Sequence, residues 1–515
     1  MAELLTLLST AAGTSTTSET AAQDSRSKTG ASALAQTTAF VRVHWLKLLA
    51  ISAAVLVPCF WHRRIEAGDL GSHLYNAWLA HLVGRGQAPG LVISPLWTNV
   101  LFDRLLSGLA DIFSMFTAEK IAVSLAVLIF FWGAFALAAA AARRAHWFVV
   151  PLIAMVAYGW TFEMGFLNYY ISLGLSFLSL ALFWRGNRLE RLLAFAPAPL
   201  LVLAHPLALV WLLGAAIYIT TVEAVPRRWK IFVLFAAAIG LVVLHFYLQS
   251  HFVTDDEENP LYVFTGADQF LLYSARYNII QAALLVFIPA SILWDVIRRR
   301  REPGVWASYA IPLQLYLLVE LGVLLLPDGI RFPGHPAALA LLTERITTVS
   351  AVLLCCLLAA MSPRRWQLAG LSAIAGTFFW FLYLDTGVLN RMEAQVERLV
   401  HTLPPGQRVL GTIKPLPGSN VLIQHMLDRA CIGHCFSYGN YEPTTGMFRI
   451  RALPGNSYNM TGGDSTADME DGSYEVQAQD LPAFQIYQCS ASGTDLCIRP
   501  LKEGEDNDRL GVHPP

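Results

Sequence analysis

Charged residues are scarce in this chain: Asp, Glu, Lys and Arg make up 14% of its 515 residues, whereas 55% are hydrophobic. The formal net charge is −1, and Lys and Arg occur in short clusters between apolar runs instead of on one basic face. The lack of a basic face argues against a nucleic-acid partner. The long apolar runs predict an α-helical polytopic membrane protein.

An apolar core long enough for export is missing from the first 40 residues, which are rich in Ser, Thr and Ala. We therefore expect residues 1–40 to be a disordered cytoplasmic tail and not a cleaved signal peptide.

Cysteine is limited to seven residues, which divide by position. Three lie in apolar segments and four in the polar C-terminal part; they are Cys59, Cys355 and Cys356, then Cys431, Cys435, Cys489 and Cys497. Four Cys in one polar region predict disulfides, and so an oxidising compartment. Three pairings are open, although Cys431 and Cys435 are close enough in sequence to pair locally.

The rule that about 20 apolar residues cross the hydrocarbon layer predicts eleven spanning helices within residues 41–385. We place them at 43–61, 119–142, 146–162, 167–184, 190–204, 206–224, 231–250, 271–296, 305–326, 336–361 and 367–385. Residues 190–224 could form one span or two, because three Pro interrupt the apolar run there. Merging the two segments would put the following basic cluster outside, so we keep two.

The positions of the basic clusters agree with this count. With the N-terminus inside, all five cytoplasmic turns carry Arg or Lys, as the positive-inside rule requires. These turns hold Arg143 and Arg144, Arg185 to Arg191, Arg227 to Lys230, Arg298 to Arg301, and Arg364 with Arg365. Arg63 and Arg64 fall on the outer side, but they begin a loop of about 55 residues, where the rule weakens. The odd number of spans places residues 386–515 outside.

The C-terminal part, residues 386–515, alternates strand-like runs with Gly and Pro turns at 403–410, 436–440 and 446–453. This pattern predicts a small extracytoplasmic α/β or β-rich domain. Residues 461–473 and 503–515 are expected to be disordered.

The first outward loop, 62–118, contains two helical patterns. Residues 69–84 fit one amphipathic helix, and apolar residues recur at helical spacing from Phe102 to Phe116. Such helices can lie in the plane of the interface and roof the outer end of the bundle.

The most informative stretch is Glu66-Ala-Gly-Asp69, which directly follows the first span and precedes His73 at helical spacing. Acidic and imidazole groups at the mouth of a membrane bundle predict a functional site. Asp69 after a Gly also fits a helix N-cap, and the two roles are compatible. Asp69 and His73 would offer a divalent cation two ligands, which stays an alternative to a site without metal.

Most other titratable groups outside the basic clusters fall at the outer ends of the predicted spans. Insertion scales put the cost of a charge at mid-helix at about 2.5–3.5 kcal/mol, so this one-sided gathering favours a binding site. The candidate residues are Glu163, Asn168, His205, Arg276, Arg331, His335 and, further in, Arg345. Structural alternatives stay open: a tight turn at Glu163, a helix end at His205, interface anchors at Arg276 and Arg331, and an ion pair at Arg345.

This organisation resembles the GT-C superfamily, polytopic glycosyltransferases that use polyprenyl-phosphate sugars, including protein O-mannosyltransferases and bacterial aminoarabinose transferases. The shared features are an acidic motif straight after the first helix, a first outward loop with two interfacial helices, an N-in bundle and an external C-terminal domain. At residue level the resemblance is confined to Glu66-Ala-Gly-Asp69 and His73. Many members have two adjacent acids, whereas here the acids are three residues apart.

The resemblance implies transfer of a sugar from a polyprenyl-phosphate donor to an envelope glycan, lipid or protein at the outer face of a bacterial inner membrane. By motif position Asp69 would be the catalytic base, assisted by Glu66. Direct displacement would invert the anomeric centre. From the topology, phosphate would be bound by Arg276, Arg331 or Arg345, since Arg matches it bidentately, and the acceptor would be positioned by His73, Glu163 and His205.

Two other functions stay open. A transporter or flippase of a lipid or solute would also place charges in a bundle, although the lack of an internal repeat and the one-sided polarity argue against it. A non-catalytic protein that anchors the C-terminal domain would tolerate substitution of the outer polar residues.

Overall fold

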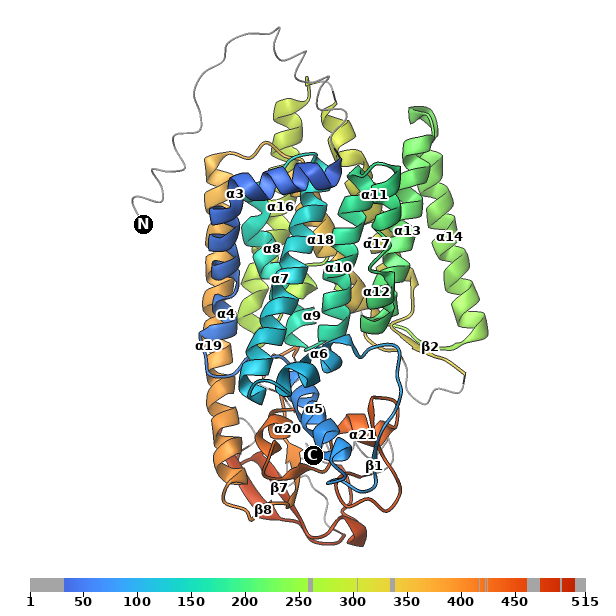
Figure 1. Cartoon of the computed structure of the whole chain (residues 1–515). Coiled ribbons are helices and arrows are strands. Elements are labelled where there is room, and N and C mark those ends of the chain that lie inside the picture. Colours follow the sequence, from blue (N-terminus) through green and yellow to red (C-terminus); the bar gives the residue numbers. More distant parts are fainter. Residues whose placement is uncertain are drawn as a thin grey trace, which may run out of the picture.

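The computed structural model of the chain describes residues 32–257, 263–302, 304–333, 339–415, 417–421, 423, 425–460, 473–490 and 493–504. These residues are mostly helical, and the helices form an upright bundle with a small sheet region at one end (Figure 1). Within the described residues, nine helices are long and apolar enough to cross a membrane. They are α3 (Ala33–Val55), α7 (Met115–Ala142), α10 (Leu167–Arg185), α13 (Pro206–Ala224), α14 (Lys230–His251), α16 (Asn278–Arg299), α17 (Val305–Leu325), α18 (Leu342–Ala359) and α19 (Arg365–Val400).

Two of the eleven predicted spans are shorter or interrupted. The segment predicted at 146–162 consists of η2 (Trp147–Val149), α8 (Val150–Ala157) and α9 (Trp160–Glu163), because the helix breaks at Tyr158 and Gly159. The segment predicted at 190–204 consists of α11 (Arg188–Leu193) and α12 (Ala198–Ala204), with Pro197 and Pro199 at the break. A Pro lacks the N–H that a continuous helix needs, so it begins a new helix here.

The first helix begins earlier than predicted. Ser32 caps α3 by accepting a hydrogen bond from the backbone N of Ala35, so residues 33–40 are helical and do not belong to a disordered tail. The first 31 residues lie outside the described part of the chain. After α3 the chain continues through the short α4 (Val57–Phe60) into the first loop.

The core of the bundle is built around a close crossing of α7 and α10. A Cβ on Gly133 of α7 would lie 2.3 Å from the carbonyl O of Gly174 on α10. Only Gly permits two helix backbones to approach so closely. Around this crossing the aromatic rings of Phe130 and Tyr170 stack, with centroids 4.3 Å apart.

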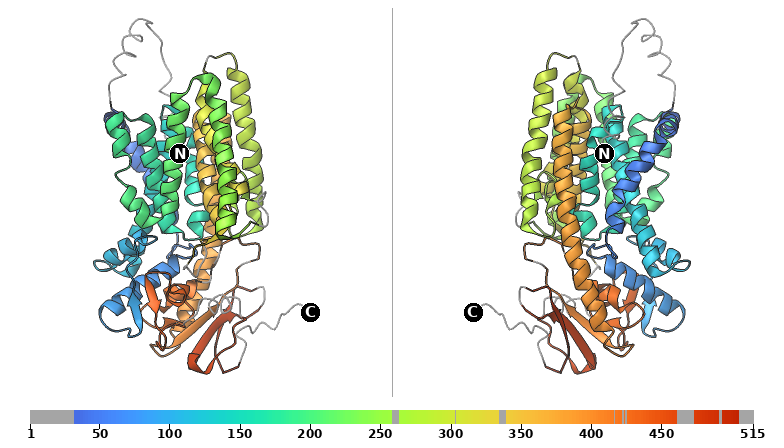
Figure 2. Two further views of the ribbon diagram at one scale, coloured as in Figure 1. Left: turned by 90° about the vertical axis from the view of Figure 1, so that its right-hand side faces the viewer. Right: turned by 90° about the vertical axis from the view of Figure 1, so that its left-hand side faces the viewer.

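The first loop and the C-terminal region meet at one end of the bundle. The loop of residues 62–114 and the described residues of 401–504 lie together there in all views (Figures 1 and 2). The helix α19 joins them to the bundle, since it continues past the predicted end at 385 for another 15 residues to Val400. The loop contains α5 (Leu70–Gly84) and α6 (Leu101–Ala110).

The helix predicted at 69–84 is present as α5, but its first two turns are covered by other parts of the chain. All residues from Leu70 to Ala77 are buried, polar ones included. Segments of the C-terminal region pack on α5: α20 (Met426–Cys431) contacts it, and the backbone N of Ser437 donates to the Tyr75 hydroxyl over 3.0 Å. The second predicted helix ends earlier, at Ala110, and the apolar pattern then continues into α7.

The C-terminal region is a small mixed α/β structure. Its sheet has the order β5-β4-β7-β8, in which β4 is parallel to β5 and β7, and β7 is antiparallel to β8. The bounds are β4 Arg408–Thr412, β5 Phe436–Ser437, β7 Ala483–Gln488 and β8 Leu496–Pro500, with α21 at Tyr441–Thr445 and η6 at Ala478–Asp480. The predicted disorder at 461–473 and 503–515 falls almost wholly outside the described residues.

Two further strand pairs and two disulfides complete the fold. The strand β6 (Ile450–Ala452) pairs with β1 (Leu91–Ile93) of the first loop, and β2 (Val253–Asp255) pairs with β3 (Gly329–Arg331). All four C-terminal Cys are oxidised, as Cys431–Cys435 and Cys489–Cys497. The local pairing considered from the sequence is therefore present, and Cys59, Cys355 and Cys356 are buried free thiols.

Candidate functional site

The Glu66–Asp69 stretch packs directly against the turn that contains Glu163. The backbone N of Gly68 donates to the carbonyl O of Glu163 over 2.6 Å, and the backbone N of Asp69 donates to Met164 O over 3.0 Å. Gly165 makes this contact possible: its φ is +80°, and a Cβ there would lie 2.4 Å from the N of Asp69. Two motifs almost a hundred residues apart are thus joined through their backbones.

The Asp69 side chain is not used as a helix cap. Asp69 occupies the N-cap position of α5 with helical backbone angles, and its carboxylate accepts no capping hydrogen bond. Its Oδ1 lies 3.5 Å from Nε2 of His425, and the side chain is 18% exposed. The interpretation of Asp69 as a cap alone is therefore wrong, and its carboxylate remains accessible beside an imidazole from the C-terminal region.

His73 forms a buried ion pair with Asp103 of α6. The Nδ1 of His73 lies 2.7 Å from Oδ1 of Asp103, and Asn168 donates from Nδ2 to the other Asp103 oxygen over 2.9 Å. Burial lowers the pKa of His73, but Asp103, Glu442 and Asp69 together outweigh burial and raise that pKa to about 10. In turn, burial raises the pKa of Asp103, but His73, Asn168 and Arg449 together outweigh burial and bring it below its ordinary value.

Glu442 of α21 approaches the same pair. Its Oε1 lies 3.7 Å from the Nδ1 of His73. Burial raises the pKa of Glu442 to about 8, with a further contribution from Asp103. The ligand atoms of His73, Asp103 and Glu442 all lie within 4.8 Å of one another. One imidazole and two carboxylates form a donor set that suits Zn²⁺ or Mn²⁺, so the residue that accompanies His73 in a candidate metal group is Asp103 and not Asp69.

A hydrogen-bonded network from the C-terminal region holds this part of α5. Asp428 accepts from Asn440 Nδ2 over 2.7 Å and lies 2.9 Å from Nδ1 of His425. Asn440 also donates to Ser72 Oγ over 2.9 Å and lies 3.0 Å from Nδ2 of Asn76. The network fixes the ring of His425, which faces Asp69, and ties α5 to α20 and α21.

Glu66 points to the other side of its loop, into a buried network of charges. Asn390 of α19 donates to Glu66 Oε1 over 2.7 Å. Burial raises the pKa of Glu66 well above its ordinary value, and the neighbouring Glu393 raises it further, although Arg429 and Arg64 act in the opposite direction. A carboxyl held in its neutral form is a poor base, so Glu66 is better suited to positioning the loop than to assisting proton removal.

The two Arg of this network bind several acids. Arg429 Nη1 lies 3.2 Å from Glu393 Oε2, and Arg429 Nη2 lies 3.7 Å from Glu119 Oε1. Arg64 Nε lies 3.3 Å from Glu393, and Arg64 also pairs with Glu397. These pairs join the first loop, α7, α19 and α20, so the network fastens the C-terminal region to the bundle.

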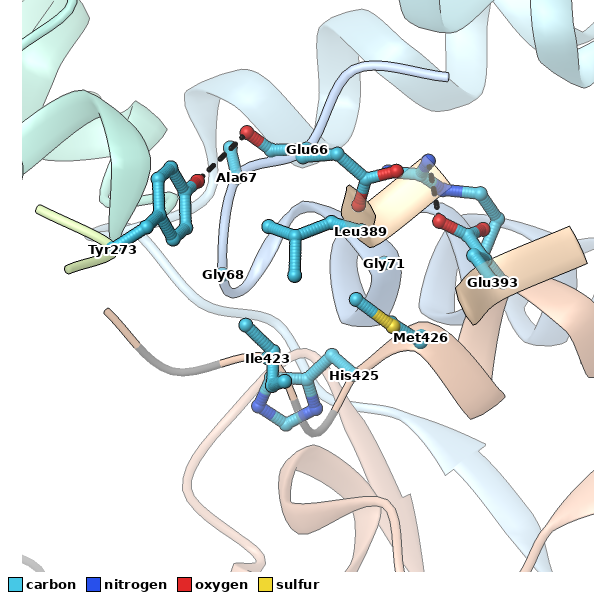
Figure 3. A pocket seen from close by; sticks show the side chains of 11 residues that line it. Glu66, Ala67, Gly68, Gly71, Tyr273, Leu389, Glu393, Ile423, His425 and Met426 are labelled. Atoms are coloured by element: carbon cyan, nitrogen blue, oxygen red, sulfur yellow. Dashed lines mark hydrogen bonds and ion pairs between the residues drawn. The ribbon is translucent and has the colours of Figure 1, made fainter. Parts of the chain in front are cut away.

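A pocket lies between Glu66 and His425 (Figure 3). It is lined by the loop before α5, by Leu389 and Glu393 of α19 and by the segment around Met426, and Tyr273 closes one side. It encloses about 280 Å³ of space, part of which is open to solvent. Because this figure includes open solvent, the enclosed room is far smaller than that of ordinary ligand clefts, roughly 300–1,000 Å³, and a bound ligand would need the lining to move.

Arg345 of α18 and His205 approach each other from the bundle. Arg345 Nη1 lies 3.3 Å from His205 Nε2, and its guanidinium lies 4.0 Å from the centroid of Phe166. The charge of Asp69 acts on Arg345, which places the two on the same side of the bundle end. Among the described residues no carboxylate lies within ion-pair distance of Arg345, and its buried Nε has no hydrogen-bond partner.

Other predicted residues are used differently. Glu163 is buried and accepts a 2.6 Å hydrogen bond from the Tyr273 hydroxyl. Arg276 is paired with Asp385 of α19, so it serves as a structural ion pair. Arg331 is exposed on β3, and no contact within the described residues joins it to the Asp69 site; it therefore does not belong to that site as predicted. His335 lies outside the described residues.

Most of the site residues that the sequence did not predict lie on α6 or in the C-terminal region. Asp103 belongs to the polar side of α6, where a lone acid is ordinarily solvated, so the sequence gives no signal that it pairs with His73. His425, Asp428, Asn440 and Glu442 come from the C-terminal region, whose sequence carries no motif linking it to the first loop. The only signal was the placement of both regions on the same side of the membrane.

No family model, no curated protein and no solved structure matches this chain.

Proposed function

We propose that this protein is a membrane glycosyltransferase of GT-C type, which transfers a sugar from a polyprenyl-phosphate donor to an envelope glycan, lipid or protein acceptor. The observation that supports the proposal most strongly is the environment of the Asp69 carboxylate. Its carboxylate caps no helix, stays partly exposed, and lies between the bundle and the C-terminal region beside His425. Such a group is available to take the proton of an acceptor hydroxyl.

The donor phosphate needs a cation, and Arg345 is the best candidate of the three predicted Arg. Arg276 is already neutralised by Asp385, and Arg331 is exposed on β3. Arg345 is held in place by stacking on Phe166 and retains an unpartnered Nε. A guanidinium with free donors matches a phosphate bidentately.

The membrane arrangement is part of the proposal. The nine long helices, together with the segments 147–163 and 188–204, would give eleven crossings with the N-terminus inside. All basic clusters except Arg63 and Arg64 then lie on the cytoplasmic side. The Asp69 site and the two disulfides lie on the other side, in the periplasm of a bacterial cell.

The proposed reaction is a single displacement. The acceptor oxygen attacks the anomeric carbon while Asp69 removes its proton, the bond from that carbon to the phosphate oxygen breaks, and Arg345 stabilises the leaving polyprenyl phosphate. The configuration at the anomeric carbon is inverted. His425 orients Asp69, and the His73–Asp103–Glu442 group, alone or with a divalent cation, fixes the adjoining wall of the site.

The experiment compares Asp69→Asn with wild type in a strain that lacks the chromosomal gene. We expect the variant to be inserted and stable but to lower modification of an envelope component by about 10²–10⁴-fold, the range typical of a lost general base. The envelope glycans, lipids and proteins are compared by mass spectrometry. Asp111→Asn is the matched control, because Asp111 is an exposed acid of the same loop whose carboxylate, among the described residues, contacts His81 alone.

Purified protein in liposomes distinguishes transfer from transport. A glycosyltransferase supplied with a lipid extract containing polyprenyl-phosphate sugars and acceptor releases free polyprenyl phosphate, whereas a flippase moves the lipid without cleaving it. Full modification of the envelope component in cells that carry a folded Asp69→Asn variant would contradict the proposed glycosyltransferase function.

A further inference from the structure

A second group of buried polar residues lies inside the bundle and is not used by the proposed reaction. It forms where α17 and α18 pack against the segment 263–270, which contains η4 (Asp268–Phe270). Asp268 is 5% exposed, and Glu320 of α17 is 2% exposed. Acids buried in a membrane bundle are costly and usually mark a functional site.

The two carboxyl groups are held by direct contacts. The backbone N of Thr265 donates to Glu320 Oε2 over 2.9 Å, and Thr347 of α18 donates to Asp268 Oδ2 over 2.5 Å. The backbone of Thr265 has a φ of +88°, a conformation that β-branched residues rarely adopt, and it directs this N–H at Glu320. Each carboxyl group is thus fixed through one oxygen.

The remaining oxygen of each acid is buried and unpartnered within the described residues, and so are two hydroxyls beside them. The four atoms are Asp268 Oδ1, Glu320 Oε1, Thr265 Oγ1 and Ser350 Oγ. Their residues adjoin one another: the charge of Glu320 acts on Asp268, and the hydroxyls of Ser350 and Tyr316 approach the Glu320 carboxyl closely enough to act on it, without an ordinary hydrogen bond to its Oε1. A Cβ on Gly266, which follows Thr265, would lie 3.0 Å from Cβ of Ser350.

No basic side chain of the described residues offsets this charge. The groups that act on Asp268 and Glu320 are hydroxyls, an amide, backbone N–H groups and the other acid of the pair. Two buried carboxylates without a counter-charge are strongly destabilising, and unpaired buried oxygens add to the cost. Carboxylate and hydroxyl oxygens are ligands for hard cations such as those of the alkali and alkaline-earth metals.

We propose that Asp268, Glu320, Thr265 and Ser350 bind a hard cation, Na⁺ or Ca²⁺, between α17 and α18. The cation fastens the first turn of α18, because Gln269 next to Asp268 donates to the carbonyl O of Glu344 over 2.9 Å. The site stands independently of the transferase function, since none of its residues contacts Asp69.

The experiment measures the Tm of the purified full-length protein in detergent at constant ionic strength, with choline chloride replaced by NaCl, KCl or CaCl₂. We expect a saturable rise of Tm with one of Na⁺ and Ca²⁺, which also identifies the ion, because a ligand that binds only the folded state raises its stability. Ser350→Ala removes one neutral ligand and should shift the midpoint of this titration to higher cation concentration. Glu320→Gln should abolish the response.

Asp328→Asn is the control variant. Asp328 belongs to a separate group of acids with Glu257 and Glu344, and it should keep the wild-type response. A response lost in Asp328→Asn and kept in Glu320→Gln would overturn the proposal, because the ion would then bind that other group. A Tm that depends on pH but on none of the cations would also overturn it, because the two acids would then share protons instead.

Discussion

At the scale of single residues, the two acids of the Glu66–Asp69 stretch have opposite environments. Glu66 is enclosed by charged groups of α19 and α20, whereas Asp69 faces a partly exposed space beside His425. Acids three residues apart in one loop can have different partners: here Glu66 contacts Asn390 of α19, whereas Asp69 lies beside His425. The roles of the two acids are separable by substitution.

Glu66→Gln tests the fastening role. Its raised pKa means that Glu66 contributes its full stability below the unfolded value of 4.5 and loses that contribution as the pH rises through the folded value. The amide stays neutral and still accepts from Asn390. We therefore expect the difference in Tm, wild type minus Glu66→Gln, to decrease as the pH rises from 5 to 8. Equal pH profiles would contradict this, and the exposed Glu302→Gln is the control for the substitution itself.

Gly165→Ala tests the backbone contact between the two motifs. The new Cβ would clash with the N of Asp69 and would also force a positive φ on Ala, which costs about 1–3 kcal/mol by strain alone. Gly86→Ala separates the two effects, since Gly86 has a φ of +68° with nothing within 4 Å. We expect both variants to lose stability but only Gly165→Ala to lose activity. Full activity of Gly165→Ala would show that the contact is not required.

Residue-level prediction from the sequence was limited by long-range pairing. Asp69, His73 and Asn168 were singled out because acids, imidazoles and amides at the ends of apolar segments are unusual, and the structure brings them to one end of the bundle. Their partners Asp103 and Glu442 could not be predicted, because which polar groups neutralise each other depends on tertiary packing. Arg331 shows the converse: its position at a helix end did not place it in the site.

At the scale of secondary-structure elements, the apolar runs predicted where most long helices lie. A long apolar run predicts a helix because backbone N–H and C=O groups that face lipid must be hydrogen-bonded within the segment. It did not predict the breaks at Gly159 and Pro197, nor the burial of the first two turns of α5 on all sides. Whether an amphipathic helix faces lipid or another part of the chain depends on what covers it, and the covering residues follow some 350 positions later.

The charge network between α19, α20 and the first loop carries a further prediction. Arg429→Met would leave Glu393 and Glu119 buried without that cation, and loss of one partner of a buried ion pair costs about 3–5 kcal/mol. Arg63→Met is the matched control, because the Arg63–Glu397 pair is exposed and such pairs contribute about 0–1 kcal/mol. Thermal unfolding in detergent should show a large loss only for Arg429→Met. Similar losses in both would refute a fastening role for the buried network.

At the scale of the whole molecule, the arrangement predicts which segments share one side of the membrane. The seven Cys are disulfide-bonded or buried, so an introduced surface Cys is the accessible thiol. We expect Trp97→Cys and Glu503→Cys to react with an impermeant maleimide from one side of sealed vesicles, and Glu302→Cys from the other. Glu302 lies between the end of α16 at Arg299 and the start of α17 at Val305. The yellow-green connection between these two helices is at the end of the bundle opposite the C-terminal region (Figure 2). Labelling of Trp97→Cys and Glu302→Cys from the same side would contradict the fold.

The residues around Asp69 come from an early and a late part of the amino-acid sequence. Asp69 and His73 are synthesised early, whereas His425, Glu442 and Arg429 leave the ribosome near the end of translation. A nascent chain therefore inserts its whole bundle before the site exists, and a chain that stops short of residue 425 carries an incomplete one. Assembly of the site is in this way tied to a finished polypeptide.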